Sequence, residues 1–354
     1  MTLMTIRVIG IKFAPVVEPR RLGSLRGRRI WHYNMVFIYI SIFLISCFVL
    51  FWAGSRFVKS AIRIAKFLKW REFVIAFFVM AMAASLPNLF VGINSALHKI
   101  PQLSFGDIVG GNMVDMTLAV AFVLLVGGAN LPADSKLIQS SALFTVIIAV
   151  LPLILVMDGR LDRIDGFILI LAFIFYSSWL FSNEERYKKI YGGRVSQDIT
   201  RGFKLFVKDS GKLIIYLLLI LIASDGIVRS AKFFSNFFDV SLPMVGILIV
   251  GLGNCIPEIY FAVISAKKSQ NWMILGDLMG SVIVCATLVL GIVALICPIQ
   301  ITEISSFAIA RIFLILSALF FLIVVRTGKQ ITKREGAILL SIYIIFLIAE
   351  VLLG

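Results

Sequence analysis

The sequence contains few charged residues and few of the side chains on which catalytic or cross-linked proteins rely. Asp, Glu, Lys and Arg make up 15% of its 354 residues, whereas a soluble domain has about a quarter. It has two histidines and four cysteines, with no HExxH or CxxC pattern. No nucleophile–base constellation or cofactor motif is present. These scarcities argue against an enzyme and a cofactor, and exclude a zinc or redox motif and a secreted disulfide scaffold.

What the sequence does contain is long apolar runs. Hydrophobic residues make up 60% of the chain, and the mean hydropathy is +1.02. Since a transmembrane helix needs about 20 apolar residues, the hydrophobic residues are numerous enough for about ten membrane spans. The runs are continuous rather than alternating, which excludes a beta-barrel. We therefore expect an all-α polytopic membrane protein in the lipid bilayer, with helices near 34–54, 73–98, 104–128, 138–157, 164–182, 211–235, 241–266, 272–298, 306–326 and 336–353.

The positive charges predict the orientation. The net charge of +15 fits basic cytoplasmic loops better than nucleic-acid binding. If the amino terminus is outside and the polar stretch 183–210 is a cytoplasmic linker, most basic loops lie on the cytoplasmic side. We expect the protein in the cell membrane. Arg56, Lys59, Arg63 and Lys66 recur at helical spacing, and we expect this face to reach the lipid headgroups. The basic tail 1–33 opposes this orientation, so Met35 is an alternative start.

The two halves of the sequence repeat each other at a constant offset of 170 residues. Matches between apolar residues are weak evidence for a repeat in such a chain, whereas matched Pro, Asp and Gly residues are stronger evidence. They include Pro87/Pro257, Gly106/Gly276, Asp107/Asp277 and Gly110/Gly280. Each repeat, 34–182 and 211–354, has five predicted helices, and an odd number inserts the second repeat upside down. Inverted repeats are typical of secondary transporters with a site at the repeat interface.

Polar residues interrupt the apolar runs beside the matched prolines. Pro87 is followed by Asn88, and Pro257 by Glu258. A proline inside a helix frees a carbonyl group, and lipid cannot satisfy such a group. Glu258 lies in the middle of its run, and a carboxylate inside the membrane is by default a candidate functional residue. The prolines alone could be tolerated kinks, but the symmetric pair predicts a binding site.

Two polar stripes follow these segments. Asp107, Gly111 and Asp115 are four residues apart, so they share one face of a helix. The second repeat places Asp277, Ser281 and Cys285 at the equivalent positions. Close helix packing explains the glycines, but not the two aspartates in one stripe. Carboxylate, amide and hydroxyl oxygens are the ligands of Ca²⁺, so the stripes predict a cation site.

These segments resemble the paired alpha-repeats of the sodium/calcium exchanger family, whose pattern is G-[TS]-S-x-P-E followed by G-[ND]-x-x-G-S-N-x-x-[ND]. The first repeat has AASLPN and GDIVGGNMVD, and the second has GNCIPE and GDLMGSVIVC. The resemblance covers nearly all of the chain after residue 34. It implies ten helices in two inverted five-helix repeats, a central cation site, alternating access, and bound Ca²⁺ and Na⁺ as transported ions.

The motif positions carry over residue by residue, with departures. Glu258 matches the second glutamate of the family, but Asn88 stands where the first is expected. Asp115 and Cys285 occupy the last motif position of each repeat. Ser85 and Ser281 match, whereas Asn254 and Cys255 replace the Thr/Ser pair. The resemblance therefore implies a ligand set of Glu258, Asp115, Asn88, Ser85, Asn254, Ser281, Asp107, Asp277 and Cys285.

The expected function is antiport of Ca²⁺ against Na⁺ or H⁺, with Glu258 and Asp115 neutralising the cation. Because desolvation disfavours a charged carboxylate, proton exchange at Glu258 stays open. Two alternatives remain. Cys255 and Cys285 would suit an exporter of a softer divalent metal, although small thiols can simply fill space. The altered first repeat would suit a cation-sensing membrane protein that does not transport. The sequence leaves the oligomeric state open.

Overall fold

The computed structural model describes residues 25–67, 80–128, 130–187, 199–267, 271–301, 307–328 and 330–353. Contacts divide the chain into two compact units, Met1–Ser41 and Ile42–Gly354. In the first unit, the Ser41 hydroxyl donates to the Phe37 carbonyl at 2.8 Å, within the first half of helix α1. All further description concerns the second unit.

The described residues are almost entirely helical. The helices of the first half are α1 (Leu25–Phe67), α2 (Met80–Ala84), α3 (Leu86–Leu97), α4 (Gln102–Val114), η2 (Asp115–Ala119), α5 (Val120–Leu125), α6 (Lys136–Leu155), η3 (Val156–Asp158) and α7 (Arg163–Tyr187). Those of the second half are α8 (Ile199–Phe238), α9 (Leu242–Val245), η4 (Gly246–Val250), α10 (Gly251–Lys267), α11 (Asn271–Val284), η5 (Cys285–Val289), α12 (Leu290–Ile296), α13 (Ala308–Thr327) and α14 (Lys333–Leu353). The predicted all-α membrane fold is confirmed.

Nine helical stretches among the described residues are long and apolar enough to cross a membrane. They correspond to nine of the ten predicted spans. The exception is the run near 73–98, where the described part consists of α2 and the 12-residue α3, separated at Ser85. Residues 68–79, which would complete this span, lie outside the described residues.

The helices α7 and α8 extend into the stretch predicted as a linker, 183–210. Helix α7 continues to Tyr187 and α8 begins at Ile199, which leaves 188–198 outside the described residues. Hydropathy marks only the apolar part of a helix, because polar turns beyond the bilayer still form backbone hydrogen bonds. The lengths of both helices predicted from the apolar runs were therefore too short.

Two short strand pairs confirm that the repeats are inverted. Strand β2 (Arg160–Leu161), after the fourth helix of the first repeat, pairs with β3 (Ile299–Gln300), after the third helix of the second. Likewise β1 (Leu131–Pro132), after the third helix, pairs with β4 (Gln330–Ile331), after the fourth. If the two repeats had the same orientation, the loops after their fourth helices would lie on the same side of the membrane. The observed pairing joins third loops to fourth loops, as inversion requires.

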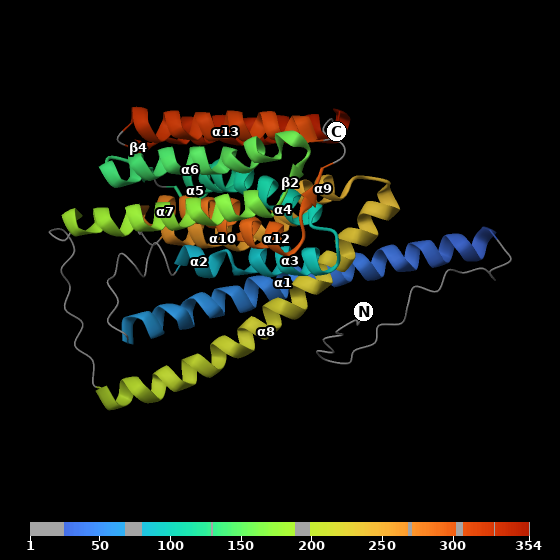
Figure 1. Ribbon diagram of the computed structural model, residues 1–354, viewed down its shortest axis with the longest axis horizontal. Coiled ribbons are helices and arrows are strands. Elements are labelled where there is room, and N and C mark those ends of the chain that lie inside the picture. Colours follow the sequence, from blue (N-terminus) through green and yellow to red (C-terminus); the bar gives the residue numbers. More distant parts are fainter. Residues whose placement is uncertain are drawn as a thin grey trace. The chain divides into compact units, whose positions relative to one another are not determined.

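The stretches α4–η2–α5 and α11–η5–α12 form the centre of this unit. Their apolar windows are 83% and 78% buried, whereas those of the other seven membrane-length stretches are at most 50% buried. Helices α6 and α13 occupy equivalent positions in the two repeats and pack against each other, as Figure 1 shows. The two polar stripes lie on the central helices, so the fold places them away from lipid.

Glycines set the distance between the central helices. A Cβ atom on Gly106 would meet the backbone of Pro243, and one on Gly110 would meet the backbone of Ile247. On the facing segment, a Cβ on Gly251 would lie 2.8 Å from the backbone nitrogen of Gly111. Real Cβ atoms do not tolerate such contacts. The glycines therefore bring α4 against η4 and α10, which carries the motif of the second repeat.

The basic face of α1 makes contacts that the headgroup interpretation did not include. Arg63 donates to both oxygens of Asp209 in α8, at 2.6 and 2.8 Å. This hydrogen-bonded pair raises the pKa of the Arg63 guanidinium. Arg56 lies over the Trp52 ring, 5.6 Å from its centroid. Arg63 thus has a partner on α8 while its side chain stays half exposed, and its position at the lipid headgroups stays a prediction.

Candidate cation site

Every residue predicted for the site is buried. None of the nine residues is more than 5% exposed, and they lie on α3, α4, η2, α10, α11 and η5 or, for Ser85, at the start of α3. They are Ser85, Asn88, Asp107, Asp115, Asn254, Glu258, Asp277, Ser281 and Cys285. By contrast, the buried polar residues of the described chain include no Lys, Arg or His. Among the described residues, the four acidic members of this set, Asp107, Asp115, Glu258 and Asp277, thus have no buried Lys, Arg or His residue near them.

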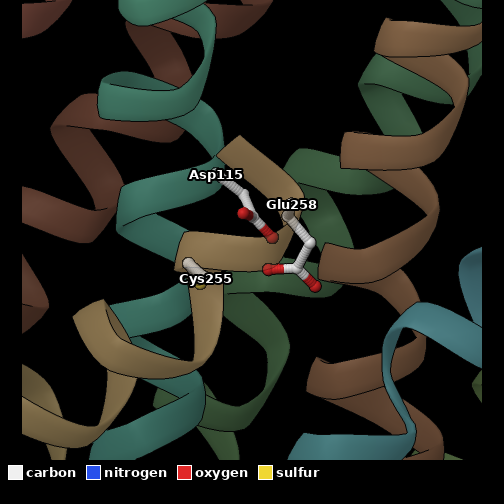
Figure 2. Close-up of side chains that lie close together, drawn as sticks. All are labelled: Asp115, Cys255 and Glu258. Atoms are coloured by element: carbon white, nitrogen blue, oxygen red, sulfur yellow. The ribbon is translucent and has the colours of Figure 1, made fainter. Parts of the chain in front are cut away.

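Three side chains point toward one another at the centre of this region, as Figure 2 shows: Asp115, Cys255 and Glu258. One ligand atom from each, two carboxylate oxygens and a sulfur, lie within 4.8 Å of one another. Cys255 and Glu258 are three residues apart on α10, so both face the same way. Asp115 comes from the other repeat, at the start of η2. The cluster therefore lies at the repeat interface.

Ser281 extends this cluster. Its hydroxyl donates to the Oε1 atom of Glu258 at 3.0 Å, and it lies on α11, the stripe predicted for the second repeat. Cys255 completes the contact on the other side, because its thiol donates to the Gly111 carbonyl at 3.6 Å. Together Asp115, Cys255, Glu258 and Ser281 form the charged half-site.

A second arrangement lies at the positions related by the 170-residue offset. Asn88 corresponds to Glu258, and Cys285 corresponds to Asp115. The Asn88 amide donates to the sulfur of Cys285 at 3.1 Å, so these two residues meet as their counterparts do. The hydroxyl of Ser85, the counterpart of Cys255, donates to the Ala81 carbonyl at 2.9 Å. We call Ser85, Asn88 and Cys285 the neutral half-site, because none of its groups is a carboxylate.

The two remaining aspartates lie beside the half-sites rather than in them. Asp107 accepts hydrogen bonds on both oxygens from the Asn254 amide, at 3.0 and 3.1 Å. Its counterpart Asp277 lies within electrostatic reach of Asp115 and Glu258. The residue equivalent to Asn254 is Ala84, which has no amide. This difference explains why Asp107 has a partner from the other repeat and Asp277 does not.

Five oxygen atoms of the predicted site residues are buried without any hydrogen-bond partner. They are Asn88 Oδ1, Asp115 Oδ1, Asn254 Oδ1, Glu258 Oε2 and Asp277 Oδ1. A buried polar atom left unpaired costs about 1–3 kcal/mol. Amide and carboxylate oxygens are hard ligands that suit Ca²⁺ and Na⁺. The free oxygens therefore fit a cation as their missing partner.

The backbone is irregular at the same two positions. The segments η2 and η5 are π-helical, and they begin at Asp115 and Cys285, one motif position in each repeat. A π-helical turn inserts one extra residue and is frequent at functional sites. Here it changes the direction in which the two helices present their polar side chains. The apolar pattern alone gives no sign of these turns.

Sequence reasoning missed two buried polar residues. Cys255 was considered as a soft ligand but was not placed among the expected ligands, although its position three residues before Glu258 on a helix is a sufficient signal. Glu350 lies in the last run of α14, is fully buried, and has no partner on either carboxylate oxygen. It lies at the end of an apolar run, where the sequence offers no second polar residue to mark it.

A cation-suited cluster between two inverted repeats of membrane-crossing helices is the arrangement of a secondary transporter. Comparison with known proteins gives the family. The sodium/calcium exchanger protein family matches residues 38–182 and 211–352. The chain belongs to this family of integral membrane ion antiporters. The predicted resemblance is confirmed.

Individual relatives span nearly the whole chain. The sodium/calcium exchanger MaX1 of Methanosarcina acetivorans is 25% identical, over 89% of this chain and 99% of its own. The inner membrane protein YrbG of Escherichia coli is 21% identical, over 87% and 95%. A structure of the sodium-calcium exchanger NCX_Mj, soaked with Na⁺ and Sr²⁺, aligns with a TM-score of 0.63 at 23% identity, over 89% and 99%. The latter supports the fold.

Proposed function

We propose that this protein exchanges Ca²⁺ for Na⁺ or H⁺ by alternating access, with the charged half-site binding the transported cation. The observation that carries the proposal is the meeting of Asp115 and Glu258 from opposite repeats, each with a buried oxygen that has no partner. Two ionised carboxylates would neutralise one divalent ion. A site between two inverted repeats can open to either side when one repeat moves against the other.

The neighbouring groups would serve as neutral ligands. Ser281 holds Glu258 in place by its hydrogen bond and has further oxygen lone pairs to offer. The free amide oxygens of Asn88 and Asn254 are buried in the same region. Asp107, Asp277, Ser85 and Cys285 would form the surrounding shell. In this assignment the altered first repeat removes one carboxylate without removing the site.

The orientation belongs to the same proposal. We place the protein in the cell membrane, with the amino terminus outside and the segment between α7 and α8 in the cytoplasm, because this arrangement puts most basic loops inside. The tail 1–33, the repeats 34–182 and 211–354 and the linker 183–210 are the proposed parts. An Asp158→Cys variant should then react with a membrane-impermeant thiol reagent in intact cells, and Asp134→Cys only after permeabilisation. The reverse labelling pattern would refute the orientation.

Transport can be tested directly with purified protein in proteoliposomes. Uptake of ⁴⁵Ca²⁺ is measured under an imposed Na⁺ gradient and, separately, under an imposed pH gradient. Uptake driven by Na⁺ supports Na⁺ coupling, and uptake driven only by the pH gradient supports H⁺ coupling. If neither gradient drives uptake while the protein still binds Ca²⁺, the proposal fails in favour of a cation sensor.

A further inference from the structure

The sulfur of Cys255 is part of the charged half-site rather than of its packing. It lies with one oxygen each of Asp115 and Glu258 inside a 4.8 Å group (Figure 2). Cys255 is 1% exposed. The thiol donates a long contact to the Gly111 carbonyl, at 3.6 Å, and is also within hydrogen-bonding reach of Asp115 and Glu258. A metal ion between the two carboxylates would therefore have a sulfur atom as its next neighbour.

Gly111 provides the space that this sulfur needs. A Cβ atom on Gly111 would lie 3.3 Å from the Cys255 sulfur, which is closer than ordinary van der Waals contact. The exchanger pattern has Ser at both of these positions, and this chain has lost both hydroxyls. The glycine and the larger sulfur atom thus complement each other. A cysteine that only filled space would not require a vacated side chain opposite it.

The two half-sites offer a comparison within the same molecule. Cys285 is also buried, but its sulfur accepts a hydrogen bond from the Asn88 amide at 3.1 Å. It faces an uncharged partner where Cys255 faces two carboxylates. Zn²⁺ and Cd²⁺ favour thiolate ligands, whereas Ca²⁺ and Na⁺ prefer oxygen alone. Glu258 and Asp115 also act electrostatically on Cys285, but among the described residues it is Cys255 whose sulfur groups with both carboxylates within 4.8 Å.

We propose that Cys255, Asp115 and Glu258 together bind a thiophilic divalent cation, of the class of Zn²⁺ or Cd²⁺, more tightly than Ca²⁺. The inference deepens the proposed function, since it concerns the ion selectivity of the same half-site. Coordination forms a metal–sulfur bond and breaks the S–H bond of the thiol. The proton leaves to the solution from which the metal ion entered. The thiolate and one ionised carboxylate neutralise the divalent ion, and the second carboxyl group keeps its proton.

The test uses the purified full-length protein in detergent and Cd²⁺ alone as the probe. A sulfur–cadmium bond absorbs in the near ultraviolet, so the titration reports sulfur ligation and affinity together. We expect the band in the wild type and in Cys297→Ser, which changes a free cysteine outside the site and serves as the matched control. Cys255→Ser should lose the band and raise the Kd for Cd²⁺ at least about tenfold. Gly111→Ala should weaken Cd²⁺ binding as well, because its Cβ displaces the sulfur.

Three results would overturn the inference. These are no band in the wild type, a band that survives in Cys255→Ser, and a band lost only in Cys297→Ser. Size-exclusion profiles show whether the variants are folded. Cys255→Ser should fold, because serine is the residue of the family pattern at this position. Uptake of ⁴⁵Ca²⁺ separates the two proposals. If Cys255→Ser loses the band but keeps Ca²⁺ uptake, both stand, and if the wild type shows the band without Ca²⁺ uptake, only the proposed function fails.

Discussion

At the scale of single residues, the site is defined by unequal counterparts. Glu258 and Asp115 meet in one half-site, while Asn88 and Cys285 meet at the equivalent positions of the other. A π-helical turn begins at Asp115 in one repeat and at Cys285 in the other, so the difference in charge between the half-sites comes from the side chains. In the proposed function, two carboxylates in one half-site would form one strong cation site instead of two weaker ones.

The hydrogen bond of Ser281 can be tested by removing its hydroxyl. Ser281→Ala leaves Glu258 without the donor that lies 3.0 Å from Oε1. Hydrogen bonds to charged groups contribute about 1.5–3 kcal/mol, so we expect the Kd for Ca²⁺ to rise at least about tenfold. Isothermal titration calorimetry measures this value. Ser341→Ala is the matched control, because that hydroxyl only donates to a carbonyl of its own helix, and equal losses in both variants would contradict the assignment.

The sequence marked buried polar residues as candidates for the site, but it could not predict which of them meet. Pro, Asp and Gly at one constant offset pointed to nine side chains that are all buried, and their role in binding stays a prediction. Which residues meet depends on the crossing of α4, α10 and α11. Asp107 therefore pairs with Asn254, and Cys255 joins the carboxylates. A sequence with no alignment contains no direct information on such contacts between repeats.

At the scale of elements, backbone contacts between the central helices fix the geometry of the site. Gly106 and Gly110 on α4 face the backbone of Pro243 and Ile247, without room for a side chain. This close approach holds η2, which begins with Asp115, next to α10, which carries Glu258. The predicted packing role of these glycines is thus also what brings the two carboxylates together.

Adding one methyl group at this contact should destabilise the fold. In Gly110→Ala the new Cβ would meet the Ile247 carbonyl, and overpacking of this kind costs about 1–3 kcal/mol. We expect a lower Tm in detergent and weaker Ca²⁺ binding. Gly211→Ala on α8 has open space around the new methyl group, and should be neutral or stabilising by about 0.5–1 kcal/mol. A Tm for Gly110→Ala at or above that of Gly211→Ala would contradict this role.

Helix ends and interruptions show what hydropathy cannot predict. The polar turns of α7 and α8 continue past the apolar runs, and the π-helical turns η2 and η5 leave no hydrophobic signature. The break between α2 and α3 lies at Ser85, two residues before Pro87, within a run predicted as one helix. In α10, by contrast, Pro257 lies inside a continuous helix. The matched prolines thus accompany a helix interruption in the first repeat but not in the second.

At the scale of the whole molecule, inversion joins the two repeats into one site. The strand pairs β1–β4 and β2–β3 connect third loops to fourth loops, and each half-site takes residues from both repeats. Movement of one repeat against the other would therefore change access to both half-sites together. The odd number of predicted helices was sufficient to foresee this architecture, because parity alone sets the direction of the second repeat.

The charge of the site predicts the electrical character of transport. The charged half-site has two carboxylates and the neutral half-site has none. Either one Ca²⁺ ion or two monovalent cations would therefore neutralise the charge of the site. We therefore expect electroneutral exchange. In proteoliposomes with a K⁺ gradient and valinomycin, an imposed membrane potential should leave the extent of ⁴⁵Ca²⁺ uptake unchanged. Uptake that rises or falls with the sign of the potential would show that a further charge moves.

The most direct test of the central claim is ⁴⁵Ca²⁺ uptake by Glu258→Gln in proteoliposomes. This change removes one charge from the site but keeps the size and most of the hydrogen bonding of the side chain. The account predicts loss of gradient-driven uptake, with Asp158→Asn, at a partly exposed surface carboxylate, retaining wild-type uptake. Full transport by Glu258→Gln would contradict the assignment of the cation to the half-site formed by Asp115 and Glu258.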